Sequence, residues 1–150
     1  MELSQRIALL YDKDTSIAYA NLQGLEAISE QEDSLYCYFD DFLSMLSSEK
    51  YVIRVRGVRL LCKQAKWDGE NKLNQFINRI LDALDDEKPT AVRQALAALE
   101  DVVKYKKELH GAIAAKVLAI DFLSYKDTMQ GLILKDIRKL MQGMEAQSTD

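Results

Sequence analysis

Side chains able to do chemistry gather in one basic segment between residues 56 and 68. Its cations recur at helical spacing and so share one helix face, as Arg56, Arg59, Lys63 and Lys66. Charged stripes of this kind are typical of solvated outer faces, and we expect these side chains to face water. Trp67 and Asp68 follow in a polar turn. The only tryptophan either anchors a partner or packs over a neighbouring repeat, and we favour packing.

Arg54 differs from these cations because a helical wheel places it inside the apolar arc, between Gly57 and Val58. A buried guanidinium is costly unless a carboxylate pairs with it, so the sequence predicts an acidic partner from a neighbouring turn. The candidates are Asp85 and Asp86. The predicted role of this pair is structural.

A second set of cations recurs at steps of 37, 38 and 38 residues, as Lys13, Lys50, Lys88 and Lys126. Each lies in a turn between two predicted helical hairpins, so stacked hairpins should align them roughly 10 Å apart. A lysine near the carboxyl end of a helix complements its dipole, and we favour this explanation. The functional alternative is a row that meets an acidic partner, formed by Lys50, Lys88 and Lys126.

Catalytic and metal-binding motifs are sparse. His110 is the only histidine and the two cysteines, Cys37 and Cys62, are far apart, so a zinc site is not expected. The sequence has no glycine-rich phosphate loop and no nucleophile elbow. Adjacent acids, as in Asp40-Asp41 and Asp85-Asp86, point about 100° apart on a helix and do not form a shared carboxylate site. The sequence therefore predicts no catalytic residue, no metal and no cofactor.

The elements that must position these side chains are copies of a 38-residue unit, clearest from Lys50 to Glu87. Each half of the unit has apolar residues at helical spacing, which predicts a helical hairpin. Steps of 38 through the second helix keep each column apolar: Phe39, Ile77 and Ala115; Phe42, Ile80 and Leu118; Leu43, Leu81 and Ala119; Leu46, Leu84 and Phe122. Small residues align in the first helix, and we expect close helix crossings at Ala20, Gly24, Gly57 and Ala95.

The repeat predicts an all-α superhelix of about three stacked hairpins, with a short helix at the start and a single helix at the end. Its expected boundaries are residues 13–49, 50–87 and 88–125 for the hairpins, 127–142 for the terminal helix, and 143–150 for a tail. Gly143 is expected to end the terminal helix in a left-handed cap. Ser48 and Asn71 are predicted N-caps, Asp14 or Thr15 caps the first repeat helix, and Pro89 begins a helix.

Composition favours a soluble single domain, since 48% of the 150 residues are hydrophobic and 29% are charged. No apolar stretch reaches the roughly 20 residues of a membrane span, and Glu2 has the wrong charge for the start of a secretory signal. The expected location is the cytoplasm. Residues 1–50 hold three basic and ten acidic side chains, against seventeen and fourteen in residues 51–150. The first third of the chain is therefore an acidic end.

Several short motifs carry a family resemblance: Arg54-Val55-Arg56-Gly57, Ala65-Lys66-Trp67-Asp68, Asn71-Lys72, Asp86-Glu87-Lys88-Pro89, Tyr125-Lys126-Asp127-Thr128-Met129 and Lys135-Asp136. Together they resemble small bacterial HEAT-like proteins that genomes often label "SufBD protein". The resemblance implies an armadillo-type superhelix, or HEAT/ARM-like solenoid, without an assigned activity or a catalytic residue. The label refers to iron–sulfur assembly, which we do not carry over, because this chain lacks the strand pattern of the scaffold proteins and has two separated cysteines.

HEAT-like repeats are also similar to those of alkylpurine DNA glycosylases, in which a curved helical stack embraces a duplex. That resemblance implies DNA contact through the basic face, with Trp67 against a base or sugar and Asp68 stabilising a developing cation. A net charge of -4 argues against it, since phosphate binding normally requires a basic domain.

We therefore predict a non-enzymatic protein–protein interaction or scaffold module that binds a partner protein or peptide through its polar ridges and curved inner face. The alternative is a nucleic-acid-binding protein related to these glycosylases. The predicted partner-binding residues are Lys50, Lys88, Lys126, Arg56, Arg59, Lys63, Lys66, Trp67 and Asp68.

Overall fold

The computed structural model describes residues 1–148, and every regular element among them is helical. The helices are α1 (Leu3–Ala8), α2 (Thr15–Gln31), α3 (Phe39–Met45), α4 (Tyr51–Lys63), α5 (Lys72–Leu81), α6 (Pro89–Tyr105), α7 (His110–Leu118) and α8 (Asp127–Ser148). Short 3₁₀ turns extend or join them, the longest at Gln64–Trp67 and Asp82–Asp85. No helix of this part of the chain has the length and apolar character needed to cross a membrane. The prediction of an all-α chain is confirmed.

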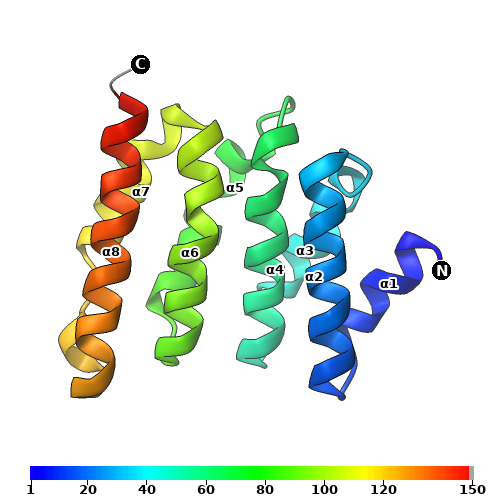
Figure 1. Ribbon diagram of the computed structural model, residues 1–150, viewed down its shortest axis with the longest axis horizontal. Coiled ribbons are helices and arrows are strands. Elements are labelled where there is room, and N and C mark those ends of the chain that lie inside the picture. Colours follow the sequence, from blue (N-terminus) through cyan, green and yellow to red (C-terminus); the bar gives the residue numbers. More distant parts are fainter. Residues whose placement is uncertain (149–150) are drawn as a thin grey trace.

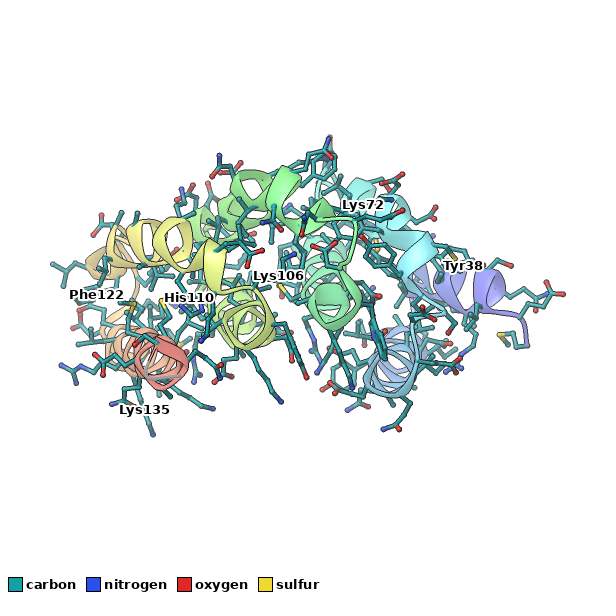
Figure 2. All side chains as sticks on the ribbon, turned by 90° about the horizontal axis from the view of Figure 1, so that it is seen from above. Tyr38, Lys72, Lys106, His110, Phe122 and Lys135 are labelled. Carbon is teal, nitrogen blue, oxygen red and sulfur yellow. The ribbon has the colours of Figure 1, made fainter. Side chains whose placement is uncertain are left out.

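The helices form two layers. Figure 1 shows α2, α4, α6 and α8 side by side, with their amino ends at the same edge, and α1 beside α2 at one end. Seen from above in Figure 2, the row is bowed: α2, α4, α6 and α8 lie on the inner side of the bend, and α3, α5 and α7 on the outer side. The core fills the space between the layers, with fully buried side chains such as Phe42, Leu61, Leu99 and Ile133.

Local sequence signals fix the starts of two helices as predicted. Asp14 is the N-cap of α2, where its carboxylate accepts hydrogen bonds from the backbone N–H groups of Ser16 (2.9 Å) and Ile17. Pro89 is the first residue of α6, where its missing N–H costs no helical hydrogen bond. The prediction that Ser48 caps the next helix is wrong. The α4 helix begins at Tyr51, because the Ser48 hydroxyl instead accepts the Lys50 N–H in the preceding turn.

The third hairpin departs from the 38-residue register in its second helix. The residues that α7 and its preceding turn bury follow those of α5 at steps of 36: Leu73, Ile77 and Leu81, then Leu109, Ile113 and Val117. The cause is a shorter connection, since six positions separate Trp67 from Leu73 but four separate Tyr105 from Leu109. The predicted buried columns at Ala115, Leu118 and Ala119 are therefore wrong, and all three residues are exposed.

The predicted end of the last helix is also wrong. The α8 helix continues past residue 142 to Ser148, and no glycine among residues 1–148 has a positive φ, so Gly143 does not form a left-handed cap. A methyl group on Gly143 would lie 3.7 Å from Val103, which indicates close packing of α8 on α6. Met144 is buried, and this apolar contact sustains the helix. Residues 149–150 of the predicted tail lie outside the described residues.

Glycine permits a close helix crossing where α4 meets α3. A methyl group on Gly57 would lie 2.8 Å from both the Met45 Cβ and the Phe42 carbonyl oxygen, so the predicted crossing at this position is confirmed. Gly24 lies directly under the Arg6 guanidinium, and Ala95 is buried. The predicted crossing at Ala20 is wrong because that side chain is exposed.

Candidate functional site

The inner surface, defined here as the exposed side of α2, α4, α6 and α8 inside the bend of Figure 2, is the candidate site. It contains a groove of about 300 Å³. All lining residues belong to α2, α4 and α6, so the groove opens away from the second layer; they are Glu26, Arg59, Lys63, Gln94, Ala97, Ala98 and Asp101. The small side chains of the two alanines leave space between longer polar ones.

Arg59 joins three helices across this groove. Its guanidinium donates two hydrogen bonds to the Glu26 carboxylate of α2, at 2.7 and 3.1 Å, and a third to the Gln94 Oε1 of α6 at 3.0 Å. Its Cζ also lies 5.6 Å from the centroid of the Tyr19 ring. Because the fork of donors meets both oxygens of Glu26, the position of Arg59 is fixed in the groove.

Lys63 makes a second bridge, one turn further along α4. Its ammonium group donates a hydrogen bond to Glu30 of α2 and lies 3.3 Å from the Asp101 carboxylate of α6. Burial alone would lower the pKa of Lys63, but the hydrogen bond to Glu30 and the Asp101 charge raise it overall. Burial raises the pKa of Asp101, although the Lys63 charge acts in the opposite direction. Desolvation thus outweighs the attraction of one cation at Asp101.

Similar pairs link α6 to α8 on the same surface. The Arg93 Nε donates to the Asp136 carboxylate at 2.7 Å, and the Lys139 ammonium lies 3.6 Å from Glu100. A second hollow, of about 310 Å³, lies beside this part of α6 and shares Gln94 and Ala97 with the first groove. The two hollows therefore form one polar trough on either side of exposed Ala97, and cations and carboxylates alternate along it.

The predicted basic stripe of α4 is not a solvated outer face. Arg56 is buried, with 7% of its surface exposed, and donates a hydrogen bond to the Leu10 carbonyl at 2.7 Å. Burial lowers the pKa of Arg56. Arg59 and Lys63 lie in the groove, and exposed Lys66 donates to the Glu30 carbonyl at 2.7 Å. The prediction of a solvated stripe is wrong because these side chains bridge α4 to its neighbours, and Arg56 is unavailable to a partner.

Trp67 packs over the neighbouring hairpin, as the favoured interpretation of the sequence predicted. Its indole N–H donates a hydrogen bond to the Ser29 carbonyl at 2.7 Å, and the side chain is half-buried. Lys66 lies above the ring, with its Nζ 5.1 Å from the ring centroid. The two residues thus satisfy carbonyl groups in the last turn of α2, which have no partner within that helix.

Asp68 is buried and occupied. Its carboxylate accepts hydrogen bonds from the backbone N–H groups of Lys72 (2.9 Å) and Leu73 (3.0 Å), and so caps α5. It replaces the predicted cap Asn71, which stands at the N-cap position in the left-handed region with φ 57° and makes no side-chain cap. Lys106 lies 3.1 Å from the same carboxylate. Asp68 is therefore inaccessible to a partner in this fold, and its inclusion among the binding residues is wrong.

The lysine row is exposed, but its predicted relation to the helix dipoles is wrong. Lys50 and Lys88 occupy the N-cap positions of α4 and α6, and Lys126 directly precedes α8. A cation at an amino end opposes the dipole. Lys88 instead lies over the Tyr51 ring, with its Nζ 5.6 Å from the centroid. A hollow of about 430 Å³ beside them is lined mainly by carboxylates, including Asp82, Asp86 and Glu87. The row is therefore interrupted by acidic side chains.

The Arg54 prediction is confirmed. The guanidinium donates from Nε (3.2 Å) and Nη2 (2.8 Å) to one oxygen of Asp86, and from Nη1 to the Ser48 carbonyl at 2.9 Å. The pair joins the start of α4 to the turn before α6, and its role in this fold is structural.

Sequence reasoning missed Glu26, Glu30, Gln94 and Asp101. A signal was present, because the two acids on α2 and the two cations on α4 both recur at a spacing of four residues. Their pairing follows an offset of 33 residues between the facing side chains, whereas the repeat has a period of 38. The stagger of neighbouring helices was needed to bring these groups together.

Comparison with protein-family models, with curated proteins and with solved structures finds no match to this chain. No group of three or more potential metal ligands from His, Cys, Asp and Glu occurs within residues 1–148. Of the two thiols, Cys37 is exposed and Cys62 is buried, and burial raises the pKa of Cys62. Any functional assignment therefore depends on the geometry of the surfaces.

Proposed function

We propose that the chain is a HEAT-like solenoid that acts as a non-enzymatic protein-interaction module of the cytoplasm and holds a partner peptide or protein on its inner surface. The observation that carries this proposal is the polar trough along α6. A bowed row of helices offers an extended surface of fixed shape, which is how stacked repeats bind partners without catalytic groups.

The trough offers groups suited to a polypeptide. Gln94 accepts from Arg59 through its Oε1, and none of the hydrogen bonds found among residues 1–148 uses its amide N–H groups, which can donate to a peptide carbonyl. The flanking ion pairs are partly exposed, and such pairs contribute only about 0.2–1 kcal/mol each. A partner with both charges can therefore exchange for them at little cost.

A nucleic acid fits this trough less well. Arg59, Lys63 and Arg93 already face carboxylates, so phosphate groups would have to displace Glu26, Glu30 or Asp136. Binding by counterion release requires cations that are free to neutralise phosphates. The glycosylase alternative also needs an accessible Asp68, and that carboxylate is buried. We therefore make the protein-binding role our proposal.

Site-specific photo-crosslinking tests the proposal. A benzophenone amino acid replacing Ala97 lies in the trough, whereas the same residue replacing exposed Ala27 of α2 is a matched control outside its lining. In an extract of the source cells, we expect a discrete protein adduct from position 97 and none from position 27. Equal labelling at both positions, or an adduct from position 97 only with nucleic acid, contradicts the proposal.

A further inference from the structure

The two ends of the helical row differ. At the amino end, α1 lies beside α2 and buries Ile7, while Leu10 in the following turn is fully buried (Figure 1). At the carboxyl end, α7 and α8 have no further element beside them within the described residues (Figure 1). In the middle of the row, α5 packs against α7 and α6 against α8. The amino end is therefore closed by a helix, whereas the carboxyl end is open.

The open end carries large exposed apolar side chains. Leu118 at the end of α7 and Leu123 in the next turn are each 68% exposed. Figure 2 places Phe122, from the same turn, at this extremity of the molecule. The shortened connection before α7 is the cause at Leu118, because it turns that residue out of the column occupied by Ile80 in the preceding hairpin. Two leucines this exposed in one short segment mark an interaction site.

Unpaired cations flank these leucines. Lys135 and Arg138 lie three positions apart on α8, share one side of it and are exposed, and Figure 2 shows Lys135 at this end of the row. No ion pair found among residues 1–148 involves either of them. On the inner side of α8, by contrast, Asp136 pairs with Arg93 and Lys139 with Glu100. We name Leu118, Leu123, Lys135 and Arg138 the end face.

We infer that the end face binds an amphipathic helix of another protein, with an apolar stripe on the leucines and carboxylates toward the two cations. Such a helix continues the row in the way that α7 continues it after α5. The basic flank selects acidic residues on the partner. A second copy of this chain fits less well, because its acidic amino end is already covered by α1 and offers no free helix. The inference is independent of the inner surface.

The test uses two fluorescent synthetic peptides of about 18 residues, or five helical turns. Both carry leucines at positions i, i+3, i+4 and i+7, and they differ only in glutamate or lysine beside that stripe. Fluorescence anisotropy with the full chain should show at least tenfold tighter binding of the glutamate peptide. The Leu118→Ser/Leu123→Ser variant should lose at least tenfold in affinity, and Lys135→Glu/Arg138→Glu should reverse the preference between peptides.

The matched control is Leu132→Ser. Leu132 is also exposed, but it lies one turn before Asp136 and therefore on the inner side of α8, so binding should not change. Helical content measured by circular dichroism should be the same for all variants. The inference is overturned if the glutamate peptide does not bind, if charge reversal leaves the preference unchanged, or if Leu132→Ser weakens binding equally. Self-association of the chain that the leucine variant abolishes also overturns it, since the occupant is then a second copy.

Discussion

The Asp68 carboxylate and the Lys106 ammonium form an ion pair of 3.1 Å between positions 38 residues apart. Asp68 is the cap of α5 and also accepts a hydrogen bond from the Tyr36 hydroxyl at 2.6 Å. Lys106 further donates to the Asn71 side-chain oxygen at 2.7 Å. One buried network therefore connects the turns of three successive hairpins, and it fixes how the second and third are stacked.

Removing one partner of this ion pair should be strongly destabilising. Lys106→Met keeps the buried alkyl stem but leaves the Asp68 charge without its cation. Breaking a buried pair in this way costs about 3–5 kcal/mol, and we expect the lower end because Asp68 retains hydrogen bonds. Urea unfolding followed by circular dichroism measures the change. The control Lys107→Met, at an exposed neighbour, should change the free energy of unfolding by less than about 0.5 kcal/mol.

The sequence predicted the elements whose signals are local. Pro89 and Asp14 start helices as expected, and Arg54 has the predicted partner Asp86. Two features failed because their cause is tertiary. Asp68 replaces Asn71 as the cap of α5 only because Lys106 and Tyr36 pack around its carboxylate. The α7 register fails because the repeat period was extended across a connection two residues shorter.

The candidate site was less predictable than the fold. Its cations were identified from their spacing, but they were placed on an outer face, because a single helix cannot show that Glu26 and Asp101 lie opposite them. The lysine row was found correctly as an exposed set, yet Lys50 and Lys88 belong to the amino ends of helices. In both cases the missing information was the geometry between helices.

Acidification should stabilise the folded chain through Asp101. Burial raises the pKa of this carboxyl above its ordinary value, so the folded chain takes up the proton at higher pH than the unfolded chain does. The contribution of Asp101 to stability therefore increases as pH falls through the raised value, and is complete below the ordinary value of 3.8. Relative to Asp101→Asn, the natural chain should gain stability between pH 7 and pH 4 in urea unfolding. If attraction to Lys63 dominated, it would lose stability instead.

Two glycine substitutions should have opposite signs. Gly57→Ala places a methyl group 2.8 Å from the Met45 Cβ and the Phe42 carbonyl oxygen, so α3 must move away from α4. Overpacking costs about 1–3 kcal/mol and outweighs the gain in helix propensity of about 1 kcal/mol. Gly131→Ala on α8 meets no atom within 4 Å, so only the propensity gain remains and the chain should be stabilised. Thermal unfolding compares the two; a stabilised Gly57→Ala variant excludes the close crossing.

Trp67→Phe distinguishes a packing role from a binding role. Phenylalanine retains most of the apolar contact but lacks the N–H that donates to the Ser29 carbonyl. Loss of this bond should cost about 0.5–1.5 kcal/mol, because the carbonyl at the end of α2 loses its partner. Urea unfolding followed by circular dichroism is the measurement, since the variant has no tryptophan fluorescence. Tyr105→Phe, at the corresponding position of the next hairpin, is the control: its exposed side chain should change stability by less than about 0.5 kcal/mol. Unchanged stability for Trp67→Phe, together with lost crosslinking from position 97, would assign Trp67 to the partner instead.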